Sequence, residues 1–134
     1  EYLSTTSAIE YALTILGVQN VVICGHSNCG GCKAIFAEPE SLAAVPHVRK
    51  WLELAACVRP VVEQMLGEGS DPEKQEWLAE QVNVVHQLNH LMTYPNVKER
   101  VARGELKVYG WHYIIETGEV FNYNFETKAF ELIA

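Results

Sequence analysis

The spacing of apolar and polar residues predicts a helix followed by a buried strand in the first part of the chain. The segment from Ser7 to Glu10 has the form of a capping box, so we predict that a helix begins there. Apolar residues continue at helical spacing to Leu16, and Gly17 stands where a left-handed residue ends a helix. The run from Val18 to Cys24 is β-branched and apolar at its centre, which predicts a parallel strand buried on both faces.

The rest of the chain alternates helices with two further strands. A glycine-rich turn over residues 25–31 leads into a short helix that begins near Cys32. Further helices are predicted over 48–66 with a bend near Pro60, over 73–94 and over 96–103, and strands over 106–111 and 120–125 with a hairpin turn at 116–119. These elements predict an α/β fold, with a mainly parallel sheet flanked by helices and a C-terminal antiparallel hairpin strand.

Length and charge narrow the functional classes. The 134 residues, 49% of them hydrophobic, are enough for one core, so we predict a single domain over residues 1–134. The chain opens on Glu1 and not on methionine, so we expect that it is incomplete at the N-terminus. A formal charge of −7 disfavours binding to nucleic acid or an anionic membrane. The apolar runs are far shorter than the roughly 20 residues that span a bilayer.

Three of the four cysteines cluster around one histidine, and this cluster says more about the function than the composition does. Cys24, Cys29 and Cys32 fall within one short segment with His26. Such spacing is typical of metal or thiolate chemistry and not of a disulfide framework. A reducing compartment, the cytoplasm or an equivalent interior, is the natural setting for it.

His26 and Cys29 are the strongest candidates for metal ligands. They follow a predicted buried strand, and an open α/β sheet binds its ligands at the carboxyl ends of its strands. Imidazole and thiolate are both zinc ligands, and their separation across a turn can bring both onto one ion. A helix that begins near Gly30 would direct free amides toward the site, which favours a Cys29 thiolate and a bound anion.

Other readings of this cluster stay open at this point. Cys24 and Cys32 are predicted to be packing residues, because cysteine is among the most buried residue types. A zinc knuckle built from the cluster alone would crowd all its ligands around one turn. Gly25 and Gly30 have the separation of a phosphate loop, but Lys33 comes two residues too late and no Ser or Thr follows it, so nucleotide binding is disfavoured.

The remaining histidines are interpreted as structural. His86 and His90 lie one helical turn apart, but the glutamate of a zinc-protease motif does not follow His86, so we predict a pair at a helix packing face. His47 and His112 are isolated in the sequence, and we expect each to be structural or at the surface.

Several separate segments together resemble the β-class carbonic anhydrases. They are residues 7–12 (SAIEYA), 22–31 (VICGHSNCGG) and 110–113 (GWHY), with Thr117-Gly118. The resemblance runs in order over essentially the whole chain. It implies a zinc enzyme that interconverts carbon dioxide and bicarbonate by zinc-bound hydroxide, and self-association as a dimer or higher oligomer.

The resemblance also assigns roles to individual residues. His26 and Cys29 match the second and third protein ligands of the family's Cys-His-Cys zinc site. Tyr11 matches a tyrosine that lines the active-site cleft and lies near the dimer contact, and Gly30 matches a residue whose amide can face the bound anion. The family's first cysteine ligand belongs to an upstream Cys-x-Asp-x-Arg motif, which does not occur in these residues.

Two hypotheses follow, and they belong to different classes. In the first, the parent protein is a zinc-dependent carbonic anhydrase, placed in the cytoplasm, a carboxysome or the chloroplast stroma. In the second, the chain is an inactive fragment or assembly module, with or without a structural zinc that recruits Cys24 or Cys32. An upstream Cys-x-Asp-x-Arg segment in the gene would separate the two hypotheses.

Overall fold

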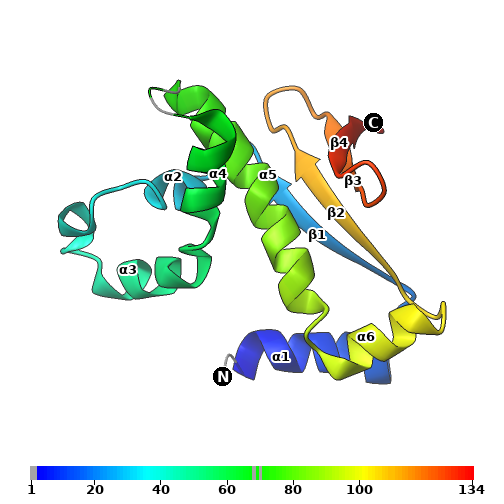
Figure 1. Ribbon diagram of the computed structural model, residues 1–134. Helices are drawn as coiled ribbons and strands as arrows, with labels where there is room; N and C mark the ends of the chain where they lie inside the picture. The colour runs from blue at the N-terminus through cyan, green and yellow to red at the C-terminus, as the bar shows by residue number, and fades with distance from the viewer. Residues whose placement is uncertain (1–2, 68, 70) are drawn as a thin grey trace.

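The computed structural model describes residues 3–67, 69 and 71–134, and in them a four-stranded mixed sheet carries helices on one face (Figure 1). The strand order is β1-β2-β3-β4. The first two strands are parallel, and the other two neighbouring pairs are antiparallel. The strands are β1 (Asn20–His26), β2 (Lys107–Tyr113), β3 (Val120–Asn124) and β4 (Ala129–Leu132). The predicted α/β class is confirmed, although the sheet has only one parallel pair.

The helices cover one face of the sheet and lie at both ends of its parallel strands. Helix α5 lies across β1 and β2, and α1 and α6 lie at the amino end of these strands (Figure 1). Helices α2 and α4 lie beside α5 near the carboxyl end of β1, and α3 lies farther from the sheet on the same side. Their bounds are α1 (Leu3–Glu10), α2 (Gly30–Ala34), α3 (Pro46–Leu52), α4 (Val58–Leu66), α5 (Pro72–Leu91) and α6 (Pro95–Ala102), with short π and 3-10 turns at η1 (Tyr11–Ile15), η2 (Pro39–Leu42) and η3 (Glu53–Ala55). None of the described helices is long and apolar enough to cross a membrane.

Helix α1 begins earlier than the capping box predicts. It is already helical at Leu3, and the Ser7 hydroxyl donates to the Ser4 carbonyl oxygen at 3.1 Å. Ser7 therefore bonds back to the preceding turn and does not cap a helix start. The predicted end of the helix is confirmed: η1 runs to Ile15, and Gly17 has the left-handed φ of 61°.

Strand β1 is covered on one face only, which corrects the prediction that both are buried. Exposure alternates along the strand, with Val22 37% exposed and Cys24 exposed, while Val21 and Ile23 pack into the core. The apolar run fixed the strand, but it did not show which face a helix covers. Cys24 is therefore not a packing residue, whereas Cys32 is buried as predicted.

Two glycines let α5 approach the sheet closely. A Cβ on Gly25 would lie 2.6 Å from Val84 Cγ2, and one on Gly110 would lie 2.6 Å from Leu88 Cδ1. Both distances are far shorter than a carbon–carbon contact of about 3.5–4.0 Å. The glycines thus fix the position of α5, and with it the position of residues that α5 presents to the carboxyl end of β1.

The core has two parts, and α5 contributes a residue to each of them. Leu13, Leu91, Val97 and Leu106 form one cluster, which joins η1, α5, α6 and the start of β2. The second cluster joins α2, α4 and α5 and consists of Cys32, Val58, Val62 and Ala79. The second cluster lies directly behind the turn that carries the candidate ligands.

Two segments differ from the predicted elements. The helix predicted over 48–66 is divided into α3, η3 and α4, so the break lies before Cys57, and Pro60 sits in the first turn of α4, where its missing N–H is not needed. Strand β4 was not predicted. Asn124 Oδ1 accepts from the amides of Glu126 and Thr127 and so turns the chain back.

Candidate metal centre

His26 and Cys29 lie on one tight turn at the carboxyl end of β1. His26 is the last residue of the strand, and the amide of Ser27 still donates to the Tyr113 carbonyl oxygen of β2 at 2.9 Å. Asn28 has a left-handed φ of 53°, which reverses the chain, and Cys29 is the extended residue before α2. The structure therefore brings both predicted ligands to the end of the sheet, where the sequence places them.

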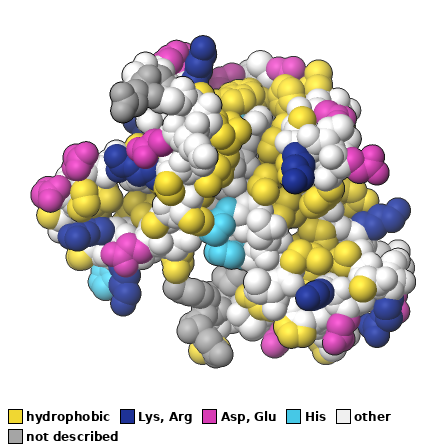
Figure 2. All heavy atoms as spheres, viewed as in Figure 1, with side chains coloured by type: hydrophobic (Ala, Val, Ile, Leu, Met, Phe, Trp, Pro, Cys, Tyr) yellow, Lys and Arg dark blue, Asp and Glu magenta, His cyan; other side chains and the backbone are white. Residues whose placement is uncertain are grey.

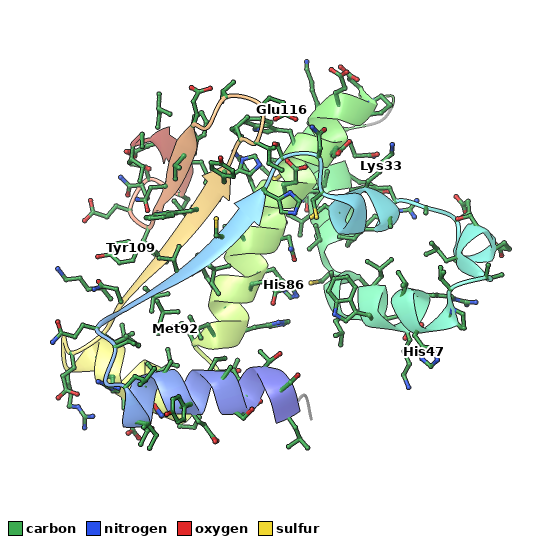
Figure 3. All side chains as sticks on the ribbon, turned by 180° about the vertical axis from the view of Figure 1, so that it is seen from behind. Lys33, His47, His86, Met92, Tyr109 and Glu116 are labelled. Atoms are coloured by element: carbon green, nitrogen blue, oxygen red, sulfur yellow. The ribbon has the colours of Figure 1, made fainter. Side chains whose placement is uncertain are left out.

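Glu116, in the loop after β2, ties this turn to the sheet from outside. The Ser27 hydroxyl donates to Glu116 Oε2 at 2.8 Å and accepts from the Ile115 amide at 2.9 Å, and the Asn28 side-chain amide also donates to Glu116. The bond from Ser27 lowers the pKa of Glu116, and a backbone hydrogen bond lowers it further. Figure 3 shows Glu116 at the same end of the sheet as Lys33 of α2.

Glu80, on the buried face of α5, holds the same turn from inside. It is 2% exposed, and its Oε2 accepts from the Cys29 amide at 3.1 Å. Its Oε1 lies 2.9 Å from Nε2 of His112, which is fully buried on β2, and Gln81 Nε2 lies 3.3 Å from His112 Nδ1. A neutral His112 protonated at Nε2 satisfies both contacts: it donates to Glu80 and accepts from Gln81.

Glu80 is the residue of this site that the sequence analysis missed. The sequence does contain a sign of it, because Glu80 is an acidic residue on the apolar side of a predicted helix. It follows Ala79 and precedes Val84 on the apolar side of α5, where a carboxylate is costly unless it is paired. A buried acid on an amphipathic helix therefore indicates a partner, which here is His112 together with the Cys29 amide. The prediction that His112 is structural is confirmed by its burial in this network.

The donor chemistry of the turn fits zinc. His26 is exposed, and its Nδ1 lies 2.8 Å from the Ser27 carbonyl oxygen, so Nδ1 carries the proton and Nε2 is free to bind a metal. Cys29 is half-buried beside Cys32. Burial, and then the charge of Cys29, raises the pKa of Cys32 to about 12, so Cys32 remains a thiol.

The third ligand is not found in the part of the chain that the structure describes. Within residues 3–67, 69 and 71–134, no three His, Cys, Asp or Glu side chains gather so as to hold a metal ion. His26 and Cys29 therefore supply a partial coordination set. A complete site needs at least one more donor.

Of the two other predicted site residues, Gly30 lies next to the predicted ligands and Tyr11 lies on a different element. Gly30 is the first residue of α2 and lines a cavity of about 870 Å³ together with Ser27 and Asn28. Tyr11 is 56% exposed on η1, near the amino end of β1, whereas His26 lies at the carboxyl end. Tyr11 is not among the residues that line this cavity.

A second cavity lies directly behind Cys29. Its volume is about 470 Å³, and most of its lining is apolar, with Ile23, Ile35 and Leu52 among the residues. Helix α5 adds a polar side through Asn83 and other residues. A mostly apolar cavity with a few polar groups next to a possible metal ligand is typical of a small-molecule site.

The fold and the turn together define the class of this chain: a mixed α/β sheet whose first strand ends in a histidine and a cysteine suited to zinc. A family model described as carbonic anhydrase matches residues 1–120. Among solved structures, the β-carbonic anhydrase CcaA has a TM-score of 0.87 and 34% identity, over 96% of this chain and 62% of that one. The chain belongs to the β-carbonic anhydrase family.

Further relatives agree with this result. Carbonic anhydrase of Helicobacter pylori strain J99 is 42% identical over 135 residues, which cover 99% of this chain and 61% of the relative. The tetrameric β-carbonic anhydrases of Sordaria macrospora match with a TM-score of 0.79 and 29% identity, over 90% of this chain and 59% of that one. The chain thus spans about three fifths of the length of these relatives.

Proposed function

We propose that the full protein is a zinc-dependent carbonic anhydrase, which catalyses the reversible hydration of carbon dioxide to bicarbonate and a proton. One observation carries the proposal: in a chain of this family, His26 and Cys29 stand on one turn at the end of β1, with donor atoms suited to zinc. The zinc dependence and the reaction are properties that the family membership supports.

His26 Nε2 and Cys29 Sγ would hold the metal. Glu80 keeps the turn in place through the Cys29 amide, and Glu116 does so through Ser27. When bound, zinc would make a water molecule acidic enough to supply a nucleophile near neutral pH. We propose that a third protein ligand comes from an upstream segment of the longer protein, together with an Asp-Arg pair.

The two cavities at the turn suit the two forms of the substrate. The apolar cavity behind Cys29 suits carbon dioxide, which has no net charge and no dipole to satisfy. The amide of Gly30, at the cavity on the other side of the turn, is the group we propose for contact with bicarbonate. This division keeps the uncharged substrate in an apolar environment and the anion near backbone donors.

We further propose that the protein self-associates as a dimer or a higher oligomer, with Tyr11 near the contact. Large apolar side chains are exposed along α1, η1 and the residue after it, namely Leu3, Tyr11, Ile15 and Leu16. An exposed apolar stretch of this kind is typical of an interaction site. A partner copy is also the way in which Tyr11 could reach a metal site. Four free cysteines support a reducing interior such as the cytoplasm.

The metal and the activity are tested together on the full-length protein. We expect His26→Ala and Cys29→Ala each to lose zinc, measured by atomic emission, and to lose carbon dioxide hydration, measured by stopped flow with a pH indicator. Cys57→Ala, at a cysteine outside the turn, is the control and should keep both. Full hydration activity in Cys29→Ala would contradict the proposal.

The isolated 134-residue chain has a different expected behaviour. Because its described residues gather fewer than three ligands, we propose that the chain alone is an inactive form that holds zinc weakly. Zinc per chain, measured with the intact mass, tests this. One tightly held zinc on the isolated chain would contradict the proposal, and its loss in Cys24→Ser or Cys32→Ser would identify the substitute ligand.

A further inference from the structure

Cys57 and His86 meet at a second place, outside the turn over residues 26–29 that carries His26 and Cys29 (the metal turn). Cys57 is the residue before α4 and is exposed, and His86 is half-buried on α5. The Cys57 sulfur lies 3.2 Å from His86 Nε2 and 3.4 Å from Nδ1. Figure 3 shows His86 pointing from α5 toward the segment that joins α3 to α4.

We propose that Cys57 and His86 form a reactive thiol site, at which Cys57 takes up a mixed disulfide from a low-molecular-weight anionic disulfide. This modification site is independent of the proposed hydration reaction. It rests on the pairing of a thiol with an imidazole, on the groove beside them, and on the contrast with the other cysteines.

The surroundings of Cys57 place a proton acceptor beside its thiol, and the thiolate is the form that reacts. An imidazole within hydrogen-bond distance can take the thiol proton and then hold the thiolate as an ion pair. Cys57 also precedes the first turn of a helix of nine residues, where the dipole favours negative charge. His86 Nε2 lies 3.4 Å from the Leu54 carbonyl oxygen, to which it can donate a proton. Nδ1, which lies 3.4 Å from the Cys57 sulfur, is then the nitrogen that accepts the thiol proton.

His90, the next histidine on α5, does not compete for this role. Its ring centroid lies 4.1 Å from that of His86. Burial, and then the charge of His86, lowers the pKa of His90. The lowered pKa disfavours a second positive charge on His90 beside the pair.

A groove of about 450 Å³ next to the pair provides room for the attached group. Cys57 and His86 line it together with apolar side chains of α4 and α5, such as Val61 and Leu78. Lys128, from the turn before β4, lines it as well and supplies a cation. Figure 2 shows histidine atoms at the centre of this face, flanked by hydrophobic side chains. An apolar wall with a lysine suits a disulfide that carries a carboxylate.

The other three cysteines lack this combination. Cys24 is also exposed, but burial raises its pKa, and its thiol donates to the Gly25 carbonyl oxygen at 3.6 Å. Cys32 is buried with a pKa of about 12, and Cys29 is the proposed zinc ligand. Cys24 is therefore the matched internal control: an exposed thiol without a histidine.

The exchange step balances without a further reagent. The Cys57 thiol gives its proton to His86, and the thiolate attacks one sulfur of the disulfide. A bond forms between Cys57 and that sulfur as the original sulfur–sulfur bond breaks. The departing thiolate takes the proton back from His86, so one disulfide and one thiol give a mixed disulfide and a free small thiol.

The test uses zinc-loaded full-length protein and oxidised glutathione near neutral pH, followed by intact mass and peptide mapping. We expect the first adduct on Cys57, with Cys24 modified at least about tenfold more slowly. His86→Gln should slow the Cys57 reaction about tenfold near neutral pH, and the loss should vanish at about pH 10, where the thiol ionises unaided. His90→Gln is the matched control and should leave the rate unchanged.

Further measurements make the outcome decisive. Unchanged melting temperature and zinc content in His86→Gln show that the slower reaction is not a loss of structure, and Cys57→Ser should abolish the first adduct. Lys128→Ala should slow the reaction of Cys57 with oxidised glutathione, which carries carboxylates. The same variant should leave the reaction with the uncharged 2-hydroxyethyl disulfide unchanged. Equal rates at Cys24 and Cys57, or an unchanged rate in His86→Gln, would overturn the proposal without touching the carbonic anhydrase assignment.

Discussion

The two faces of the sheet are built from the same strands and differ in almost every other respect. On the face toward α5, glycines replace side chains at the closest contacts, and a buried Glu80 bonds to a buried His112. The opposite face leaves Val22 partly exposed, and the indole nitrogen of Trp111 is buried without a hydrogen-bond partner among the described residues. Figure 3 shows Tyr109 of β2 pointing away from α5, toward that open side.

This difference shows where the site gets its rigidity. The metal turn is positioned by the covered face, through Glu80, and by the loop after β2, through Glu116. Among the residues that the structure describes, no side chain of the open face makes a polar contact that holds the turn. Substitutions on the two faces should therefore differ in their effect on stability, in an order that the contacts set.

The largest expected effect is at Glu80. Glu80→Ala should lower the free energy of unfolding by about 2–5 kcal/mol, because it leaves the His112 and Cys29 donors buried without an acceptor. Urea denaturation checks this. Glu80→Gln, which keeps one acceptor, should lose less, and Glu73→Ala at the exposed start of α5 should lose no more than about 1 kcal/mol. A loss below about 1 kcal/mol in Glu80→Ala would show that the network is not important for stability.

The next effect is at the glycine under α5. Gly110→Ala should destabilise the protein by about 1–3 kcal/mol, because the new Cβ would overlap Leu88 and Val84 in a packed core. Gly30→Ala is the matched control, since nothing lies within 4 Å of a Cβ there. It should stay within about 0.5 kcal/mol of the wild type. Equal unfolding energies for the two variants would mean that α5 moves freely over the sheet.

Substitutions at two neighbouring residues of β1, one on each face, give the most direct comparison of the stability that the two faces contribute. Ile23 packs into the core cluster of α5 and α6, whereas Val22 points to the open face. Ile23→Ala should cost about 1–3 kcal/mol and Val22→Ala less than about 1 kcal/mol, both measured by urea denaturation of the isolated chain. In the full-length protein a larger cost for Val22→Ala than in the isolated chain would show that another segment covers the open face.

Much of this arrangement was predictable from local pattern, and the exceptions have physical reasons. The strand at Val18 to Cys24, the long helix and the turn with His26 and Cys29 each depend on neighbouring residues, and the structure contains all three. The face that α5 covers depends on contacts between distant segments, such as Gly110 with Leu88, and no local pattern shows them. For the same reason, the pairing of Glu80 with His112 and of Cys57 with His86 appears only in three dimensions.

The smallest expected effect on stability is at Glu116, in the loop after β2, whose side chain bonds to Ser27 and Asn28 of the metal turn. Because the Ser27 hydroxyl lowers the pKa of Glu116 in the folded protein, the unfolded chain binds more protons as the pH falls. The stabilisation is therefore present above the ordinary glutamate pKa and is lost as the pH falls through the lowered value. Glu116→Gln lacks the charge, so the difference in melting temperature between it and the wild type should shrink between about pH 6 and about pH 3. Glu126→Gln, on the exposed turn before β4, controls for the loss of a surface charge. A difference that stays constant across this range would show that the carboxylate charge does not hold the turn.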